Sequence, residues 1–190
     1  MLLDLRRGLV ALLALTVLVG IAYPALVFGI GQAAFRGAAN GSLVHSGGRT
    51  VGSALIGQSF DDPKYFWGRP SAAGDGYDPR ASGASNLGPT SAKLDQEVRE
   101  RLEALLKSNP GTTAAQVPSE LVTASGSGLD PDISPAAADF QVNRVARARG
   151  LDPAAVARLV EQHTQGRTLG IFGEPRVNVL ELNLALDRLR

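Results

Sequence analysis

Four closely spaced aspartates are the first residues in this chain that suggest chemistry. Asp61, Asp62, Asp75 and Asp78 fall within 18 residues, and carboxylates at this density can concentrate cations. Their spacing is not that of an EF-hand loop, and they stand among prolines and glycines, where aspartate commonly caps turns. We therefore expect turn caps, with cation binding as the alternative.

Ser125 and Ser127 are the candidates for nucleophilic chemistry. Neither has the glycine two residues before it that the nucleophile elbow G-x-S-x-G requires. The only histidines available as a base are His45 and His163, and neither has a second histidine at metal-ligand spacing. His163 shares an apolar helical face, so we expect a structural role for it.

Other common kinds of site have little support. The chain lacks G-x-x-x-x-G-K-[ST], and Gly29-Ile30-Gly31 with Ala34 matches G-x-G-x-x-A only after an apolar run instead of a strand. The absence of cysteine excludes disulfides, thiolate catalysis and cysteine-ligated metals. Beyond residue 36 the chain carries 16 basic and 17 acidic residues, which argues against a nucleic-acid surface.

The first structural element that the sequence predicts is a long apolar stretch near the N-terminus. No charge interrupts the 28 residues from Gly8 to Phe35, and the core span Leu9–Phe28 has 20 residues. As a helix this span is about 30 Å long, which matches the hydrocarbon core of a bilayer. We expect a retained membrane anchor at 8–35, kinked at Pro24.

The flanking charges predict the orientation. Arg6 and Arg7 precede the span and only Arg36 follows it, so residues 1–7 are expected in the cytoplasm and residues 36–190 outside it. The alternative is a cleaved signal peptide ending near Gly31-Gln32-Ala33. The apolar run is about twice as long as the hydrophobic region of a usual signal peptide.

Residues 36–190 are expected to form a single α+β domain. N-capping residues predict four helices, and short apolar runs predict strands. Arg144, Arg147 and Arg149 are expected to be solvated near a helix C-terminus, where they compensate its dipole. The predicted helices start at Thr90 or Ser91, Ser134, Asp152 and Asn178, and end near Lys107, Gly150, Gly166 and Leu189; the predicted extended segments are Leu43-Val44, Ala54–Ile56, Glu120–Ala124 and Leu169–Phe172.

One segment without regular structure is expected to be ordered. Asp61–Pro89 contains four prolines and five glycines, but five of the ten aromatic residues of the chain lie in it or directly before it. Flexible linkers do not carry so much apolar surface, so we expect a packed loop with a recognition role. The alternative is an ordinary buried loop. We call residues 60–89 the aromatic loop; its aromatic residues are Phe60, Tyr65, Phe66, Trp67 and Tyr77.

A set of motifs resembles a known family. They span nearly the whole chain, in this order: Tyr23-Pro24, Ala39–Leu43, Val51–Phe60, Tyr65–Ala72, Ser85–Thr90, Leu121–Pro131, Ile133–Pro135, Gln141-Val142, Arg144–Ala146 and Val177–Asn183. Together they resemble the C subunit of the Kdp-type potassium-transporting ATPase of bacteria and archaea. Three positions depart from the family pattern: Ala84 replaces a usual glycine, Thr90-Ser91 replaces Thr-Asn, and Asp132 stands where histidine is frequent.

The resemblance implies a non-catalytic, single-span subunit of the bacterial inner membrane. It implies a high-affinity K⁺ uptake complex that uses ATP with Mg²⁺. Its partners would be a channel-like K⁺-binding subunit, a P-type ATPase catalytic subunit and a small one-helix subunit. The family is described as a catalytic chaperone that raises the ATP affinity of the ATPase subunit. Because only residues 1–7 would be cytoplasmic, we expect an indirect effect and assign no ATP-contacting, catalytic or metal-binding residue.

We expect four segments to make the contacts with these partners and with the lipid bilayer: the membrane anchor and residues 52–60, 65–90 and 125–135. Arg69 and Asn86 are the leading candidates for polar contacts, with internal ties in the loop as the alternative. Two other functions stay open: a membrane-anchored serine hydrolase using the serines at 125 and 127, and a free-standing anchored binding domain. The predicted contact residues are Tyr23, Pro24, Gln58, Tyr65, Phe66, Arg69, Asn86, Ser125, Ser127 and Asp130.

Overall fold

The structure is a computed structural model that describes residues 1–189. It divides into two compact units, one of residues Met1–Leu43 and one that starts at Val44 and runs to the C-terminus.

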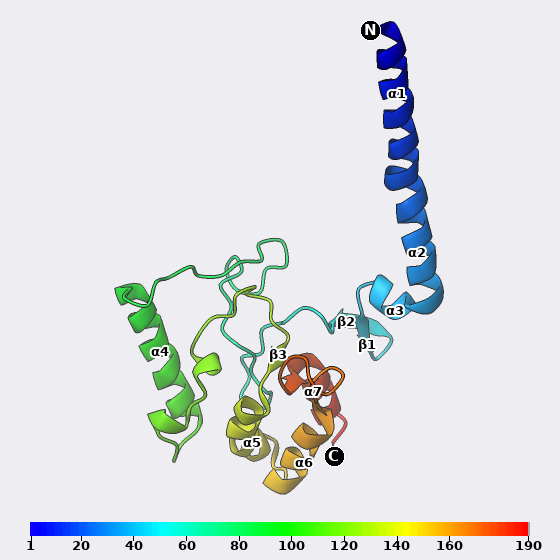
Figure 1. Cartoon of the computed structure of the whole chain (residues 1–190). Helices are drawn as coiled ribbons and strands as arrows, with labels where there is room; N and C mark the ends of the chain where they lie inside the picture. The colour runs from blue at the N-terminus through cyan, green and yellow to red at the C-terminus, as the bar shows by residue number, and fades with distance from the viewer. Residues whose placement is uncertain (190) are drawn as a thin grey trace. The chain divides into compact units, whose positions relative to one another are not determined.

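The first unit is dominated by one long apolar helix (Figure 1). α1 (Leu2–Val17), the π-helical turn η1 (Leu18–Ala22) and α2 (Tyr23–Ala34) form a continuous helical stretch of 33 residues. A short helix, α3 (Arg36–Ala39), follows. No residue of α1, η1 or α2 is buried within the protein. The helix is long and apolar enough to cross a membrane.

Pro24 explains the π-helical turn. Proline has no backbone N–H, so an α-helix that contains it loses a hydrogen bond to the preceding turn. Directly before Pro24, the Tyr23 N–H donates to the Leu18 carbonyl, five residues back instead of four. The extra residue in this turn is how the helix accommodates the proline expected to disturb it.

The second unit contains four longer helices whose starts confirm the predicted caps. They are α4 (Ala92–Ser108), α5 (Pro135–Arg149), α6 (Pro153–His163) and α7 (Val179–Leu186), with 3₁₀ turns η2 (Ala114–Gln116) and η3 (Ser119–Leu121) between α4 and α5. In each helix the capping side chain accepts a hydrogen bond from a backbone N–H of the first turn. The caps are Ser91, Ser134, Asp152 and Asn178.

The strands are short and antiparallel, which confirms the α+β class. β1 (Leu43–Ser46) pairs with β2 (Arg49–Ser53), and a separate sheet has the order β3-β5-β4. In that sheet β5 (Arg176–Asn178) is central, between β3 (Asp132–Ile133) and β4 (Thr164–Gln165). Ile133 and Thr164 both lie opposite Val177.

Three of the predicted extended segments were wrong. The region Glu120–Ala124 overlaps the 3₁₀ turn η3, and Ala54–Ile56 is a turn closed by the Ile56 N–H on the Ser53 carbonyl. Leu169–Phe172 forms the turn between β4 and β5. Short apolar runs do not distinguish strands from tight turns, because both fit the same composition.

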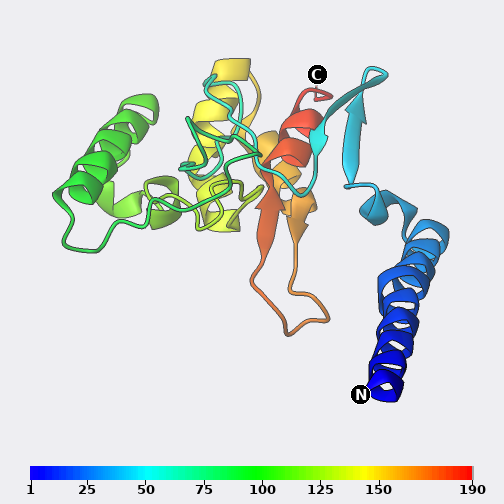
Figure 2. The ribbon, with the colours of Figure 1, turned by 90° about the horizontal axis from the view of Figure 1, so that it is seen from above.

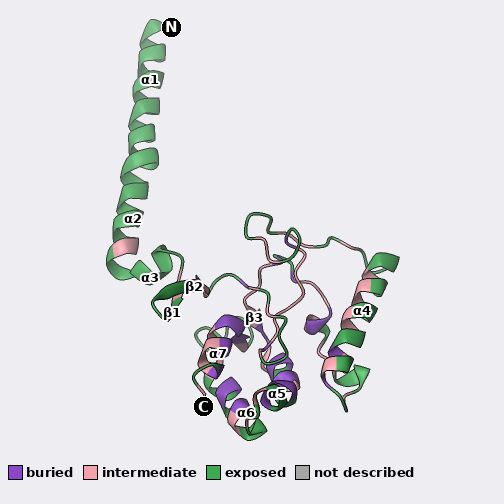
Figure 3. Ribbon diagram, turned by 180° about the vertical axis from the view of Figure 1, so that it is seen from behind, coloured by how far each residue is buried: buried purple, intermediate pink, exposed green. Residues whose placement is uncertain are grey.

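The core of the domain lies among α5, α6, α7 and β5. The burial colours in Figure 3 concentrate on these helices. α4 stands to one side of them in Figures 1 and 2 and contributes one buried residue, Leu105. The fully buried side chains Val145, Val156, Val177 and Leu182 come from four different elements. The aromatic loop packs against this core.

Candidate functional site

The aromatic loop has no helix or strand, yet it packs into the core. Phe66 is completely buried within the main apolar cluster, and Phe60 and Trp67 pack against that cluster. Ala73, farther along the loop, is also fully buried. The prediction of an ordered, packed loop is confirmed.

Two buried side-chain amides hold the loop by its backbone. Asn183 of α7 accepts from the Phe66 N–H (2.8 Å) and donates to the Phe66 carbonyl (2.9 Å). Gln141 of α5 makes the same pair of hydrogen bonds with the next residue, Trp67 (2.8 and 3.1 Å). Each amide therefore satisfies both backbone groups of one residue, as a neighbouring strand would. Both amide side chains are buried, so water cannot replace them.

Arg144 of α5 adds a third tie, and the prediction of a solvated side chain there was wrong. Its guanidinium donates to the carbonyls of Pro63 (2.6 Å) and Tyr65 (3.0 Å) and to Gln141 Oε1 (2.6 Å). It also stacks on the Trp67 ring, 3.9 Å from the centroid. Burial lowers the pKa of Arg144 to about 10, so it remains a cation at neutral pH. Partners some 80 residues away in the chain outweigh the local preference for solvent.

Arg149 ties the same part of the loop to α7. It donates to the Lys64 carbonyl (2.7 Å) and to Asp187 (2.6 Å), and its guanidinium lies 4.9 Å from the Tyr65 ring centroid. The Tyr65 hydroxyl also reaches Asp187, at 3.2 Å. Arg149 was also expected to be solvated, and it is only partly so, whereas Arg147 is exposed as predicted.

The second half of the aromatic loop is tied to residues 125–131, which we call the serine loop. Arg69 pairs with Asp130 at 3.1 Å, and Ser71 donates to the Gly128 carbonyl at 2.6 Å. The Tyr77 hydroxyl donates to the Arg69 carbonyl. Burial raises the pKa of Tyr77 to about 12, so this phenol stays protonated and remains a donor. The internal tie weighed for Arg69 is therefore present.

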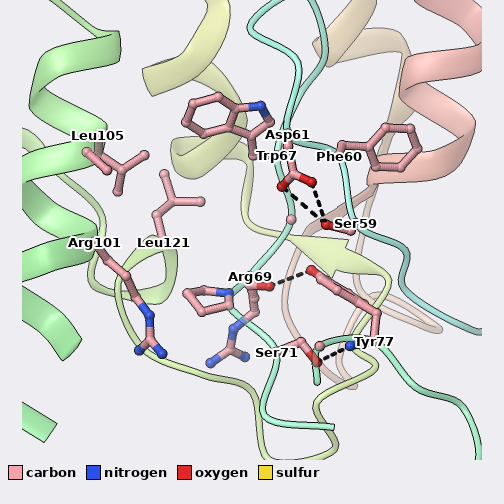
Figure 4. Close-up of a pocket in the computed structure, with 14 residues that line it drawn as sticks. Ser59, Phe60, Asp61, Trp67, Arg69, Ser71, Tyr77, Arg101, Leu105 and Leu121 are labelled. Carbon is pink, nitrogen blue, oxygen red and sulfur yellow. Dashed lines mark hydrogen bonds between the residues drawn. The ribbon is translucent and has the colours of Figure 1, made fainter. Parts of the chain in front are cut away.

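A cavity of about 380 Å³ opens between the aromatic loop and α4. Figure 4 shows Trp67 and Phe60 at one end and the guanidinium groups of Arg69 and Arg101 at the other. Both arginines already have carboxylate partners, since Arg101 pairs with Glu97 at 2.9 Å. The cavity is thus an amphipathic hollow whose charges are balanced by the protein itself.

The serines predicted as alternative nucleophiles have separate environments. Ser125 is buried, and its N–H donates to the Pro70 carbonyl (3.2 Å), whereas Ser127 is exposed. The ring of His163 bonds the carbonyl of Leu159, and His45 bonds Thr50. Among residues 1–189 neither histidine is hydrogen-bonded to a serine, so no nucleophile–base pair is assembled there.

Two of the four aspartates confirm the turn-cap prediction. Asp62 accepts from the Lys64 N–H (3.0 Å) and Asp78 from the Arg80 N–H (2.9 Å). The hydrogen bond from the Lys64 N–H holds the pKa of Asp62 below its usual value. Within the described chain, no three histidine, aspartate or glutamate side chains are grouped closely enough to hold a metal ion.

Asp132, which departs from the family pattern, lies at the edge of the small sheet. It pairs with Arg176 at 3.2 Å and accepts from Asn178 at 3.3 Å. Burial raises the pKa of the Asp132 carboxyl, and the Arg176 charge opposes the shift. Asp130 and Glu181 add repulsion, so the ionised form is disfavoured relative to the unfolded chain.

The raised pKa of Asp132 predicts a pH-dependent contribution to stability. A folded pKa above the unfolded value means that the folded state binds more protons, so stability falls as pH rises from about 4 through the folded pKa. Asp132→Asn should therefore stabilise the chain at pH 7, by less than about 1 kcal/mol because the site is partly exposed, and the gain should vanish near pH 3. Urea denaturation at both pH values checks this; Asp139→Asn on the exposed side of α5 is the control, and a loss of stability at pH 7 would contradict the prediction.

Gly128 lets the two loops approach closely. Its φ is +67°, and a Cβ there would lie 2.7 Å from the Ala73 nitrogen and 2.8 Å from the Gly83 carbonyl oxygen. Gly128→Ala should therefore lower the free energy of unfolding by about 1–3 kcal/mol. Gly126→Ala is a matched control two residues away, because nothing lies within 4 Å of a Cβ there. Equal midpoints of urea denaturation for the two variants would contradict this account.

Comparison with known proteins places this architecture in a family. The family model described as "KdpC: K+-transporting ATPase, c chain" matches residues 5–188. The chain belongs to the KdpC family. It is 60% identical to the potassium-transporting ATPase KdpC subunit of Sorangium cellulosum, over the whole of both chains. The subunits of the same name from Gemmatimonas aurantiaca and Herpetosiphon aurantiacus are 58% and 54% identical, covering 97% of this chain and 92% and 96% of theirs. The chain is accordingly an accessory subunit and not the catalytic one.

The residues predicted as partner contacts in this KdpC-family chain differ in what they expose. Tyr23 is 62% exposed on α2, next to Pro24. Asn86 is exposed, with a left-handed φ of +52° that asparagine tolerates well. Phe66 has no exposed surface, so in this fold it is a core residue. The remaining predicted contacts are half-buried or tied internally: Gln58 to the Val51 carbonyl, Tyr65 to Asp187, Arg69 to Asp130, and Ser125 and Ser127 within the serine loop.

Sequence reasoning missed the residues that shape this site. Gln141, Arg144 and Asn183 all stand within the family motifs, but no role was derived for the two amides, and the arginine was expected to lie in solvent. The available signal was a large polar residue on an otherwise apolar helical face. Such a residue is buried only where it finds partners, and here those partners are loop backbone groups.

Proposed function

We propose that this KdpC-family chain is a non-catalytic subunit required to assemble a high-affinity, ATP-driven K⁺ uptake complex. The observation that supports this most directly is the aromatic loop, fixed to α5 and α7 by the buried side chains Gln141, Arg144 and Asn183. A loop ordered before binding loses little conformational entropy on contact with a partner. The polar side chains at this site hold the aromatic loop in place, an arrangement that suits recognition of a partner better than catalytic turnover.

The proposed partners are those that the family resemblance implies. They are a channel-like K⁺-binding subunit, a P-type ATPase subunit that uses ATP and Mg²⁺, and a small single-helix subunit. The proposed contact surface comprises residues 52–60, the aromatic loop and the serine loop, with Asn86 as its exposed amide. The apolar helix would pack against partner helices within the membrane.

The proposed topology puts the N-terminus in the cytoplasm of a bacterium and the domain on the other side of its inner membrane. Arg6 and Arg7 precede the apolar helix and only Arg36 follows it. Protease added to intact spheroplasts should then digest residues after 36 and leave the helix protected. Degradation only after the membrane is permeabilised would reverse the orientation.

This topology requires an indirect effect on ATP. Residues 1–7 cannot build a nucleotide pocket, so the chain would act as a chaperone by binding better to the ATPase conformation that binds ATP better. Couplings of this kind are typically about 1–3 kcal/mol, or roughly 5–150-fold in affinity.

Removing the chain should therefore weaken ATP binding by the catalytic subunit about 5–150-fold and abolish K⁺-dependent ATPase activity. By reciprocity, ATP should tighten binding of the chain to the other subunits by the same factor. Nucleotide titration of the complex with and without this chain measures the change in ATP affinity. Pull-down of the chain with the other subunits, in the presence and absence of ATP, measures the reciprocal change in subunit binding. Full K⁺-dependent activity from the remaining subunits alone would refute the proposal.

A further inference from the structure

The β4–β5 hairpin ends in an apolar tip that no contact in the domain explains. Leu169, Ile171 and Phe172 are 84%, 69% and 60% exposed. No charged residue lies between Arg167 and Glu174, which form an ion pair of 2.7 Å across the base of the turn. Figure 2 shows this turn projecting from the small sheet. We call residues 167–174 the hairpin tip.

Four backbone N–H groups of the hairpin tip find their hydrogen-bond partners within the turn itself. The N–H groups of Thr168 and Phe172 donate to each other's carbonyls (2.8 and 2.9 Å). Those of Gly170 and Ile171 donate to the carbonyls of Arg167 (3.0 Å) and Thr168 (3.3 Å). The pairing of these four donors lowers the cost of moving the turn out of water, and the remaining backbone groups can stay hydrated at the level of the headgroups.

The tip also holds its apolar side chains outward by a defined conformation. Leu169 has a φ of +55°, a left-handed conformation that is rare for leucine, and glycines with positive φ follow at 170 and 173. Between Arg167 and Glu174 the side chains of the tip carry one polar group, the Thr168 hydroxyl, whereas protein interfaces normally combine apolar contacts with a rim of directional hydrogen bonds. Lipid requires no such rim.

If the N-terminal helix is embedded in a membrane, the covalent connection keeps the start of β1 close to that membrane. Eight residues (35–42) separate α2 from β1, and a segment of that length spans at most about 30 Å. A tether this short gives a weak second contact a high effective concentration.

We propose that the hairpin tip inserts Leu169, Ile171 and Phe172 into the interfacial region of the bilayer as a second membrane contact. The Arg167–Glu174 pair then lies at the level of the headgroups, where charged groups stay hydrated. The contact limits how the domain tilts over the membrane. It requires the anchor but none of the partner subunits, so it can be tested with this chain alone.

The absence of cysteine makes the test direct. Ile171→Cys in the full-length chain is labelled with an environment-sensitive fluorophore and reconstituted in vesicles of phosphatidylcholine and phosphatidylglycerol, with or without bromine on the acyl chains. Gln165→Cys at the exposed base of the hairpin and Glu103→Cys on the exposed face of α4 are matched controls. Emission of the single tryptophan, Trp67, verifies that each variant is folded.

The expected result is a blue-shifted label at 171 that loses about half of its emission in brominated vesicles, as suits a shallow insertion of roughly 5–10 Å. The label at 165 should be quenched less and the label at 103 not at all. Equal quenching at the three positions, or none at 171, overturns the proposal. A label at 171 that shifts only when the partner subunits are added, without quenching by brominated lipid, assigns the tip to a protein interface and also overturns it.

Discussion

Replacing Phe66 with alanine is expected to lower the free energy of unfolding by about 3–5 kcal/mol. The side chain is completely buried in the main apolar cluster, so its removal loses the apolar contacts and leaves a hole that the rigid core cannot fill. Urea denaturation of the full chain in detergent, followed by circular dichroism, measures the change. A loss of this size is a large fraction of the stability of a typical domain.

Phe172→Ala provides the matched control. It is the same substitution on a side chain that is 60% exposed at the hairpin tip. Without a membrane this variant should stay within about 0.5 kcal/mol of the parent. Similar losses for the two variants would show that the aromatic loop contributes no more to the core than an exposed turn does.

The outcome bears on how much of the loop was predictable. The number of aromatic residues in a segment rich in proline and glycine correctly predicted an ordered loop. It did not distinguish which aromatics face the core. Phe66 was expected to contact a partner and is buried, whereas Tyr65 beside it is partly exposed. In a segment without a regular repeat, sequence offers no periodicity from which to assign faces.

Helix starts were predictable because their signals are local. Ser91, Ser134, Asp152 and Asn178 each cap the helix that follows, using backbone groups two or three residues away. The N-terminal helix was equally clear, since composition alone separates it from the rest. No knowledge of the tertiary structure was needed for either.

The interactions that build the site are not local, and sequence reasoning missed them. Asn183 lies 117 residues from Phe66, and Gln141 lies 74 residues from Trp67. Arg144 was placed in solvent because an arginine near a helix C-terminus usually lies there. Only the packed structure shows that the loop carbonyls of Pro63 and Tyr65 accept hydrogen bonds from its guanidinium.

These ties also bear on the proposed coupling. A domain that influences a catalytic subunit through binding must present one defined surface, because a surface that reorders on contact spends binding free energy on its own ordering. The buried amides of Asn183 and Gln141 act on adjacent residues of the loop, at the point where it crosses α5 and α7. Loosening this point should weaken the contact surface before the whole domain unfolds.

Asn183→Leu is the second substitution with a large expected effect, a loss of about 2–6 kcal/mol in the free energy of unfolding. Leucine has nearly the same size as asparagine but no hydrogen-bonding group, so the Phe66 N–H and carbonyl lose their partner. Water cannot replace it, because Asn183 is 1% exposed and Phe66 is fully buried. Each buried backbone group without a partner costs about 1–3 kcal/mol. Asn143→Leu, at an exposed position of α5, is the control and should change stability by no more than about 0.5 kcal/mol.

The double variant Asn183→Leu, Gln141→Met decides whether the two amides act as one clamp. Once either amide is lost, residues 66 and 67 can move together away from the helices, so the second substitution should cost less than it does alone. A double-mutant cycle should then give a coupling of about 0.5–3 kcal/mol. Additive losses within about 0.5 kcal/mol would mean that the amides hold the loop independently. In that case each residue of the aromatic loop would be fixed by its own contacts, and a partner could displace one residue without releasing the other.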